Sequence, residues 1–122
     1  MAFTLSTRAD NLGTKIVEDI SAAATGQNNV FGAAANLFAL LINNSLNAST
    51  TVYLKLWNHN SPTVGTTLPH MVIPCAGGQT RQYTFDAGAN FAIGISYACV
   101  TGSADASTAS PSAAVSIALL AT

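Results

Sequence analysis

Short segments of alternating apolar and polar residues, separated by turn residues, make up most of this chain beyond residue 36. The clearest segment covers residues 51–57, where Val52, Leu54 and Leu56 alternate with a second set of side chains. Because successive side chains of a β-strand point to opposite faces of a sheet, a period of two residues indicates strands rather than helices. The pattern therefore predicts an all-β fold.

The same alternation, or a short apolar run, predicts further strands at residues 3–7, 37–43, 68–75, 79–85, 91–101 and 113–121. Asp86-Ala87-Gly88 predicts a turn after one of these strands, and Gly94 predicts a bulge or a close backbone approach inside another. Pro69 and Pro74 suit strand ends or a sheet edge. Short strands at regular spacing predict an antiparallel β-sandwich or a jelly-roll-like barrel.

The first part of the chain differs from the rest. Between residues 10 and 24 the apolar positions follow neither a clean helical nor a clean strand period, and residues 21–35 are mostly small and polar. We therefore expect an extended N-terminal arm over 1–35 and a β-sandwich domain over 36–122. A length of 122 residues suits one such domain.

Charged residues are scarce in this sequence. They make up only 7% of the chain, against about 25% in an average soluble domain, and the net charge is -1. A surface of Ser, Thr, Asn, Gln and Ala repels its neighbours weakly, because net charge is what keeps free proteins apart. The composition favours a component of an assembly over a free cytosolic enzyme.

Several classes of partner are disfavoured by the same composition. No basic cluster is present, so we expect no nucleic acid partner. No apolar run approaches the roughly 18 residues of a spanning helix, so we expect no membrane partner. Residues 1–8 lack the charged and apolar regions of a signal peptide, so we expect synthesis in a cytoplasm without export.

The residues with reactive side chains form no recognisable site. Zinc ligands usually come in close pairs, whereas His59, His70, Cys75 and Cys99 are spread over the sequence, so we expect no metal. The two cysteines can pair only if their strands are adjacent, and two buried thiols are the simpler interpretation. No nucleophile, phosphate-loop or dinucleotide motif is present, so we expect neither an enzyme nor a cofactor.

The best candidates for protein contact lie in the segment 51–57. Tyr53, Lys55 and Trp57 share the face opposite Val52, Leu54 and Leu56, and Tyr and Trp are enriched at interface hot spots. The alternative is that this face is buried and that Trp57 belongs to the core. The complete predicted interface set is Phe3, Leu5, Arg8, Tyr53, Lys55 and Trp57.

Part of the chain resembles a family of small tailed-phage proteins. The resemblance spans residues 43–100 and is carried by Val52-Tyr53-Leu54-Lys55-Leu56-Trp57, Ser61-Pro62-Thr63-Val64-Gly65-Thr66-Thr67, Pro69, Phe85, Gly88, Phe91 and Gly94-Ile95-Ser96-Tyr97-Ala98. It implies a structural virion protein of β-sandwich type, similar to proteins that cement or decorate capsids. It transfers no site residue to this chain.

These observations lead to a main hypothesis and two alternatives. In the main hypothesis the chain is a capsid cement or decoration protein on the capsid exterior. Its partners are the major capsid protein and further copies of itself, and the arm reaches across a seam of the shell. The first alternative is a tail, baseplate or fibre-associated module that contacts the host surface. The second is a free, monomeric binding domain.

Overall fold

The computed structural model describes residues 3–7 and 15–122. The strands are β1 (Thr4–Thr7), β2 (Lys15–Ala22), β3 (Ala35–Asn43), β4 (Val52–Asn58), β5 (Met71–Cys75), β6 (Thr80–Phe91), β7 (Ile95–Val100) and β8 (Val115–Ala121). Within these described ranges there is no helix, and so none long and apolar enough to cross a membrane.

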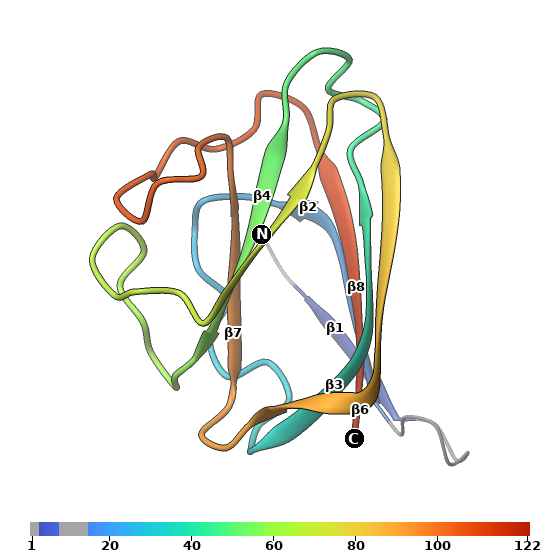
Figure 1. The fold of residues 1–122 in the computed structure, drawn as a ribbon, viewed down its shortest axis with the longest axis vertical. Helices are drawn as coiled ribbons and strands as arrows, with labels where there is room; N and C mark the ends of the chain where they lie inside the picture. The colour runs from blue at the N-terminus through green and yellow to red at the C-terminus, as the bar shows by residue number, and fades with distance from the viewer. Residues whose placement is uncertain (1–2, 8–14) are drawn as a thin grey trace.

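The strands form two antiparallel sheets that face each other (Figure 1). One sheet has five strands in the order β1-β2-β8-β3-β6, and the other has three in the order β5-β4-β7. Each strand pairs with its neighbours in antiparallel register. The prediction of an all-β antiparallel sandwich is therefore confirmed.

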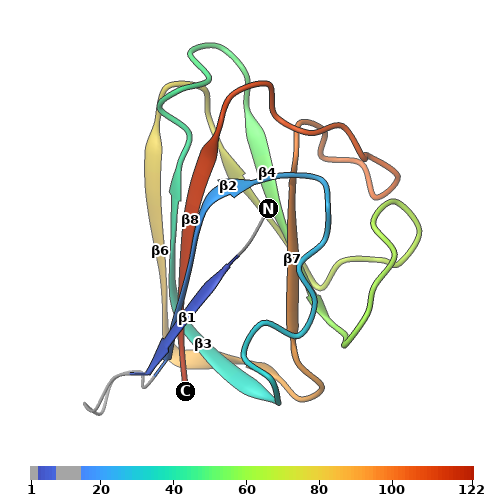
Figure 2. The ribbon, with the colours of Figure 1, turned by 180° about the vertical axis from the view of Figure 1, so that it is seen from behind.

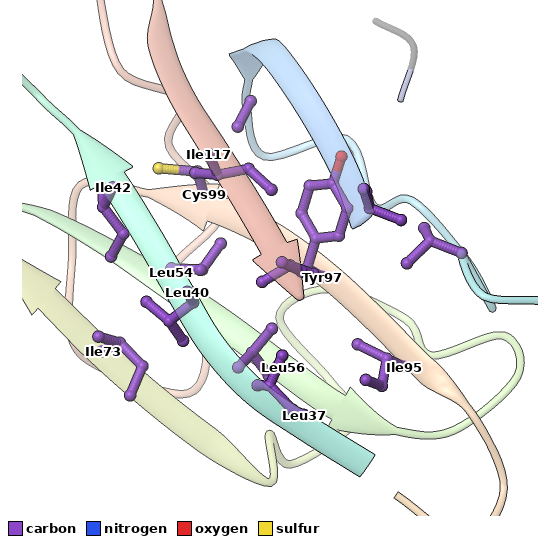
Figure 3. Packing of buried hydrophobic residues seen from close by; sticks show 14 of the residues in the cluster. Leu37, Leu40, Ile42, Leu54, Leu56, Ile73, Ile95, Tyr97, Cys99 and Ile117 are labelled. Carbon is purple, nitrogen blue, oxygen red and sulfur yellow. The ribbon is translucent and has the colours of Figure 1, made fainter. Parts of the chain in front are cut away.

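The core consists of apolar side chains from the two inner sheet faces (Figure 3). On β8 the buried and half-buried positions alternate along the whole strand. Their alternation follows from the pleat, which sends every second side chain into the sandwich. Members from the central strands are Leu37, Leu40, Ile42, Leu54, Leu56, Ile117 and Leu119.

Two tyrosines connect the sheets near their edges. On one side, the Tyr83 hydroxyl of β6 donates a 2.9 Å hydrogen bond to the carbonyl oxygen of Pro74 on β5. On the other side, the Tyr97 hydroxyl of β7 donates a 2.6 Å bond to Oδ2 of the buried Asp19 on β2. Burial, and next the hydrogen bond to Asp19, raise the pKa of Tyr97 above its usual value. The proline at 74 lies on an edge strand, as predicted.

Residues 15–35 belong to the sandwich, which corrects the predicted boundary at residue 35. β2 lies between β1 and β8, with Val17 opposite Leu119. The chain then runs along the free edge of β7, where Gln27 and Tyr97 exchange backbone hydrogen bonds of 2.9 and 3.0 Å. These pairings join residues about 70 to 100 positions apart, so local periodicity gave no sign of them. Of the predicted arm, positions 1–2 and 8–14 lie outside the described residues.

The predicted turn at 86–88 is instead a distortion inside β6. The register with β3 shifts there, between Leu37 and Ala39. Gly88 has a φ of 79°, and a Cβ at this position would lie 3.1 Å from the Phe38 ring, so only glycine fits without strain. The expected strand over 91–101 is also divided, because residues 92–94 separate β6 from β7.

Candidate interaction surface

Two of the three predicted contact residues of β4, Lys55 and Trp57, are not available at the surface, which corrects that part of the predicted set. The exposed fraction is 0% for Lys55 and 1% for Trp57, and Tyr53 is half-buried. The reason is that the loops of residues 59–70 and 101–114 lie over the outer side of the three-stranded sheet (Figures 1 and 2). The alternative interpretation, in which Trp57 is buried, is the correct one.

Lys55 holds one of these loops from below. Its ammonium donates hydrogen bonds of 2.6, 3.3 and 3.4 Å to the carbonyl oxygens of Ala104, Asp105 and Ser107. Burial lowers the pKa of Lys55, and the nearby negative charge of Asp105 partly opposes this effect. Three acceptors match the three donors of an ammonium group. Lys55 therefore fixes the loop and is not free to bind a partner.

Trp57 holds the other loop in a similar way. Its indole Nε1 donates a 2.8 Å hydrogen bond to the carbonyl oxygen of Thr67. The loop closes on itself, because the amides of Thr66 and Thr67 both donate to the carbonyl of Thr63. Gly65 has a φ of 90°, and a Cβ there would collide with the Thr108 side chain at 2.6 Å. The two loops thus contact each other above the sheet.

This geometry gives a structural role to residues 61–67, one of the segments named above for the resemblance. Residues 61–67 build the loop that covers Trp57. Bonds between Thr63, Thr66 and Thr67 close the loop within that segment, and the indole of Trp57 bonds it from outside. Its Gly65 is needed because of the close approach to the second loop. The motif therefore encodes a structural cover for the three-stranded sheet.

The predicted contact residues of the N-terminal segment lie at different depths. Phe3 is half-buried and packs against the core, whereas Leu5 on β1 is 43% exposed. Arg8 lies outside the described residues. The described residues of the predicted interface set therefore do not form one continuous exposed surface.

The two cysteines are both buried and unpaired. Cys75 lies on β5 and Cys99 on β7, and β4 separates these strands. Adjacent strands are about 4.8 Å apart, so two strand spacings exceed the reach of a disulfide. Burial raises the pKa of the Cys99 thiol to about 12 and also raises that of Cys75, which makes both thiols poor nucleophiles.

Both histidines line one polar hollow of about 270 Å³ beside the loop of residues 59–70. His59 Nδ1 accepts a 2.9 Å hydrogen bond from the Ser61 amide, and the His70 ring packs edge-on against Phe91 with centroids 5.0 Å apart. In the described part of the chain, no three His, Cys, Asp or Glu side chains gather as a metal would require.

The outer face of the five-stranded sheet has a different character. Ile16, Leu120 and Ala39 lie side by side in one row across β2, β8 and β3, and Ala118 and Leu41 lie side by side in the next. We call these five residues the apolar stripe. Its side chains are half-buried, or exposed in the case of Leu41 at 39%.

No described segment lies over the apolar stripe, on the side of the sandwich opposite the loops (Figures 1 and 2). Two shallow hollows of about 230 and 240 Å³ indent this face, and Ala39 and Leu120 line both. Phe38 and Phe85 extend the apolar lining of the second hollow. The apolar stripe and these two hollows together form the candidate interaction surface.

The sequence contains a signal for this surface, namely apolar residues at the outward positions of β3 and β8, which the strand prediction did not take into account. An antiparallel sheet with one face in water normally alternates between apolar and polar residues. β3 instead contains an unbroken apolar run from Leu37 to Ile42, and β8 has Ala118 and Leu120 at its outward positions. An unbroken apolar run is typical of strands that are covered on both faces.

Comparison with known proteins identifies no relative of this chain: no family model, curated protein or solved structure matches it.

Proposed function

We propose that this protein is a structural component of a phage virion, and specifically a cement or decoration protein that binds the outside of an assembled shell. The resemblance of residues 43–100 to small tailed-phage proteins favours this function. A small protein that bridges two shell subunits adds buried area that must be lost before the shell opens. Binding through several copies raises avidity without new kinds of contact.

The observation that carries the proposal is the near absence of charge on the folded surface. The chain has 4 Lys and Arg and 5 Asp and Glu residues, and two of these, Lys55 and Asp19, are buried. Folding therefore removes charge from a surface that already had little. Together with the uncovered apolar stripe, this surface suits a protein that works in contact with others.

The location in the particle is tested by copy number. The proteins of purified phage particles are separated on a gel. The band of this chain is then compared by densitometry with the band of the major capsid protein. A cement protein is present in on the order of hundreds of copies, because it follows the symmetry of the shell. Absence of the chain from purified particles would refute the proposal.

A tail, baseplate or fibre module is the alternative, and the same measurement identifies it by a far lower copy number. One form of this alternative binds host glycans through an exposed Tyr53 and Trp57. Trp57 is covered by its own loop, so that form of the alternative loses its basis.

A further inference from the structure

We infer that the outer face of the five-stranded sheet is a self-association surface, and that its occupant is the same face of a second copy related by a two-fold axis. Identical patches meet in such an interface, so the face must suit itself in area, charge and shape. This inference goes beyond the proposed function and does not depend on it, because pairing concerns the isolated chain.

The first argument is area. A five-stranded sheet with strands about 4.8 Å apart is about 24 Å wide, and a strand the length of β8 adds about 24 Å in the other direction. Each copy can therefore bury roughly 600 Å², which gives roughly 1,200 Å² in total. Specific interfaces need about 1,000 Å² or more. The face is large enough for a weak dimer and too small for a tight one.

The second argument is charge. The two rows that contain the apolar stripe are completed by Thr4, Ser6, Glu18, Gln82 and Thr84. Among these described positions Glu18 is the one ionisable side chain, and it lies on β2, off the central strands. A nucleic acid or a strongly charged peptide finds no partner charge here. Outside these two rows, Asp86 lines the second hollow, so the face carries two acidic side chains, Glu18 and Asp86. Neither belongs to the apolar stripe, so docking of a second copy over the stripe itself buries no unpaired charge there.

The third argument is packing. Sheets that pack face to face keep their strands within about 30° of each other and lie about 10 Å apart, so small side chains at the centre allow close approach. Ala39 and Ala118 provide such positions between Leu41 and Leu120. The hollows that flank Ala39 and Leu120 receive larger side chains of the facing copy.

The experiment uses the full chain in the absence of shells. Sedimentation velocity is measured from about 1 µM to about 1 mM, the range in which a small interface dissociates. We expect a concentration-dependent shift from monomer to dimer. Ala118→Arg places a cation at the centre of both faces and should leave only monomer at every concentration. Leu68→Arg is the matched control, because Leu68 is 72% exposed on the loop over the other sheet, and it should dimerise as the original chain does.

A measurement without substitutions covers the case in which Ala118→Arg fails to fold. Amide chemical shifts of the original chain are followed by NMR on dilution. Shifts confined to outward residues of β2, β3 and β8 support the inference. A monomer at the highest concentration, dilution shifts confined to residues 59–70, or unchanged pairing in folded Ala118→Arg would each overturn it. Shell binding is scored separately, so a monomer that still decorates particles refutes this inference alone.

Discussion

The outer faces of the two sheets are treated in opposite ways by the same chain. The three-stranded sheet is covered by two loops that Lys55 and Trp57 hold in place, so even a lysine on β4 is fully buried. The five-stranded sheet has an apolar stripe with no described segment over it. This difference indicates that the apolar stripe is a distinct surface feature and not an incompletely buried part of the core. Within the described residues, loops of this chain cover the outer face of one sheet and not that of the other.

The largest effect in this comparison is expected at Trp57. Trp57→Ala removes a buried indole from beneath its loop and should lower the free energy of unfolding by about 3–5 kcal/mol. The decrease is measured by urea unfolding followed by circular dichroism. Tryptophan fluorescence cannot be used, because Trp57 is the sole tryptophan of the sequence. Trp57→Phe keeps a ring and loses the bond to Thr67, so it should cost less. Equal costs for the two variants would show that the loop does not depend on packing against the indole.

A smaller decrease in the free energy of unfolding is expected on substitution of Lys55. Lys55→Ala leaves three loop carbonyls without their donor and opens a gap below them, so it should cost roughly 2–4 kcal/mol. Hydrogen exchange should also become faster in residues 101–110 than in β2 or β3. Lys55→Met, which keeps the apolar stem, provides the control and should be less harmful. If exchange in the loop stays unchanged in both variants, the ammonium does not anchor it.

The smallest effect is expected on the uncovered sheet. Ile20 follows Glu18 by two residues on β2 and is 81% exposed. Ile20→Thr keeps a β-branched side chain, so the free energy of unfolding of the monomer should stay within about 0.5 kcal/mol. Thermal unfolding in dilute solution checks this. A loss of about 2 kcal/mol or more, the size of a core truncation, would mean that Ile20 is covered after all and would remove the contrast between the two sheets.

The parts of the fold that could be predicted are those with a local cause. The alternation around Leu54 and the turns after it predicted β4 and most of the later strands, because the pleat imposes its period on neighbouring residues. At Gly94 the prediction was a bulge or a close backbone approach inside a strand. Gly94 instead lies between β6 and β7, and the close approach comes from a side chain, since a Cβ there would lie 2.5 Å from Oδ1 of Asn29. The continuity of β6 was missed, because the bulge at Gly88 looks like a turn in sequence.

The candidate surface was predicted less well than the fold. The two-residue period correctly placed Lys55 and Trp57 on the outer face of β4. It did not show whether solvent or a loop covers that face. The predicted contact residues did not include Ala39, Ala118 or Leu120, because alanine and leucine in strands are usually expected in the core. Only the register of β3 with β8 places them together on the outside.

The sequence by itself determined the strand class of this protein, its shortage of charge and the residues of its inner faces, since each depends on composition or on a two-residue period. The tertiary structure alone decided that β2 lies inside a sheet, between β1 and β8, that loops cover one outer face and that no described segment covers the apolar stripe on the other. The physical reason is distance along the chain. Which segment covers which face depends on contacts between residues tens of positions apart, such as Lys55 with Ala104, and no local pattern encodes them.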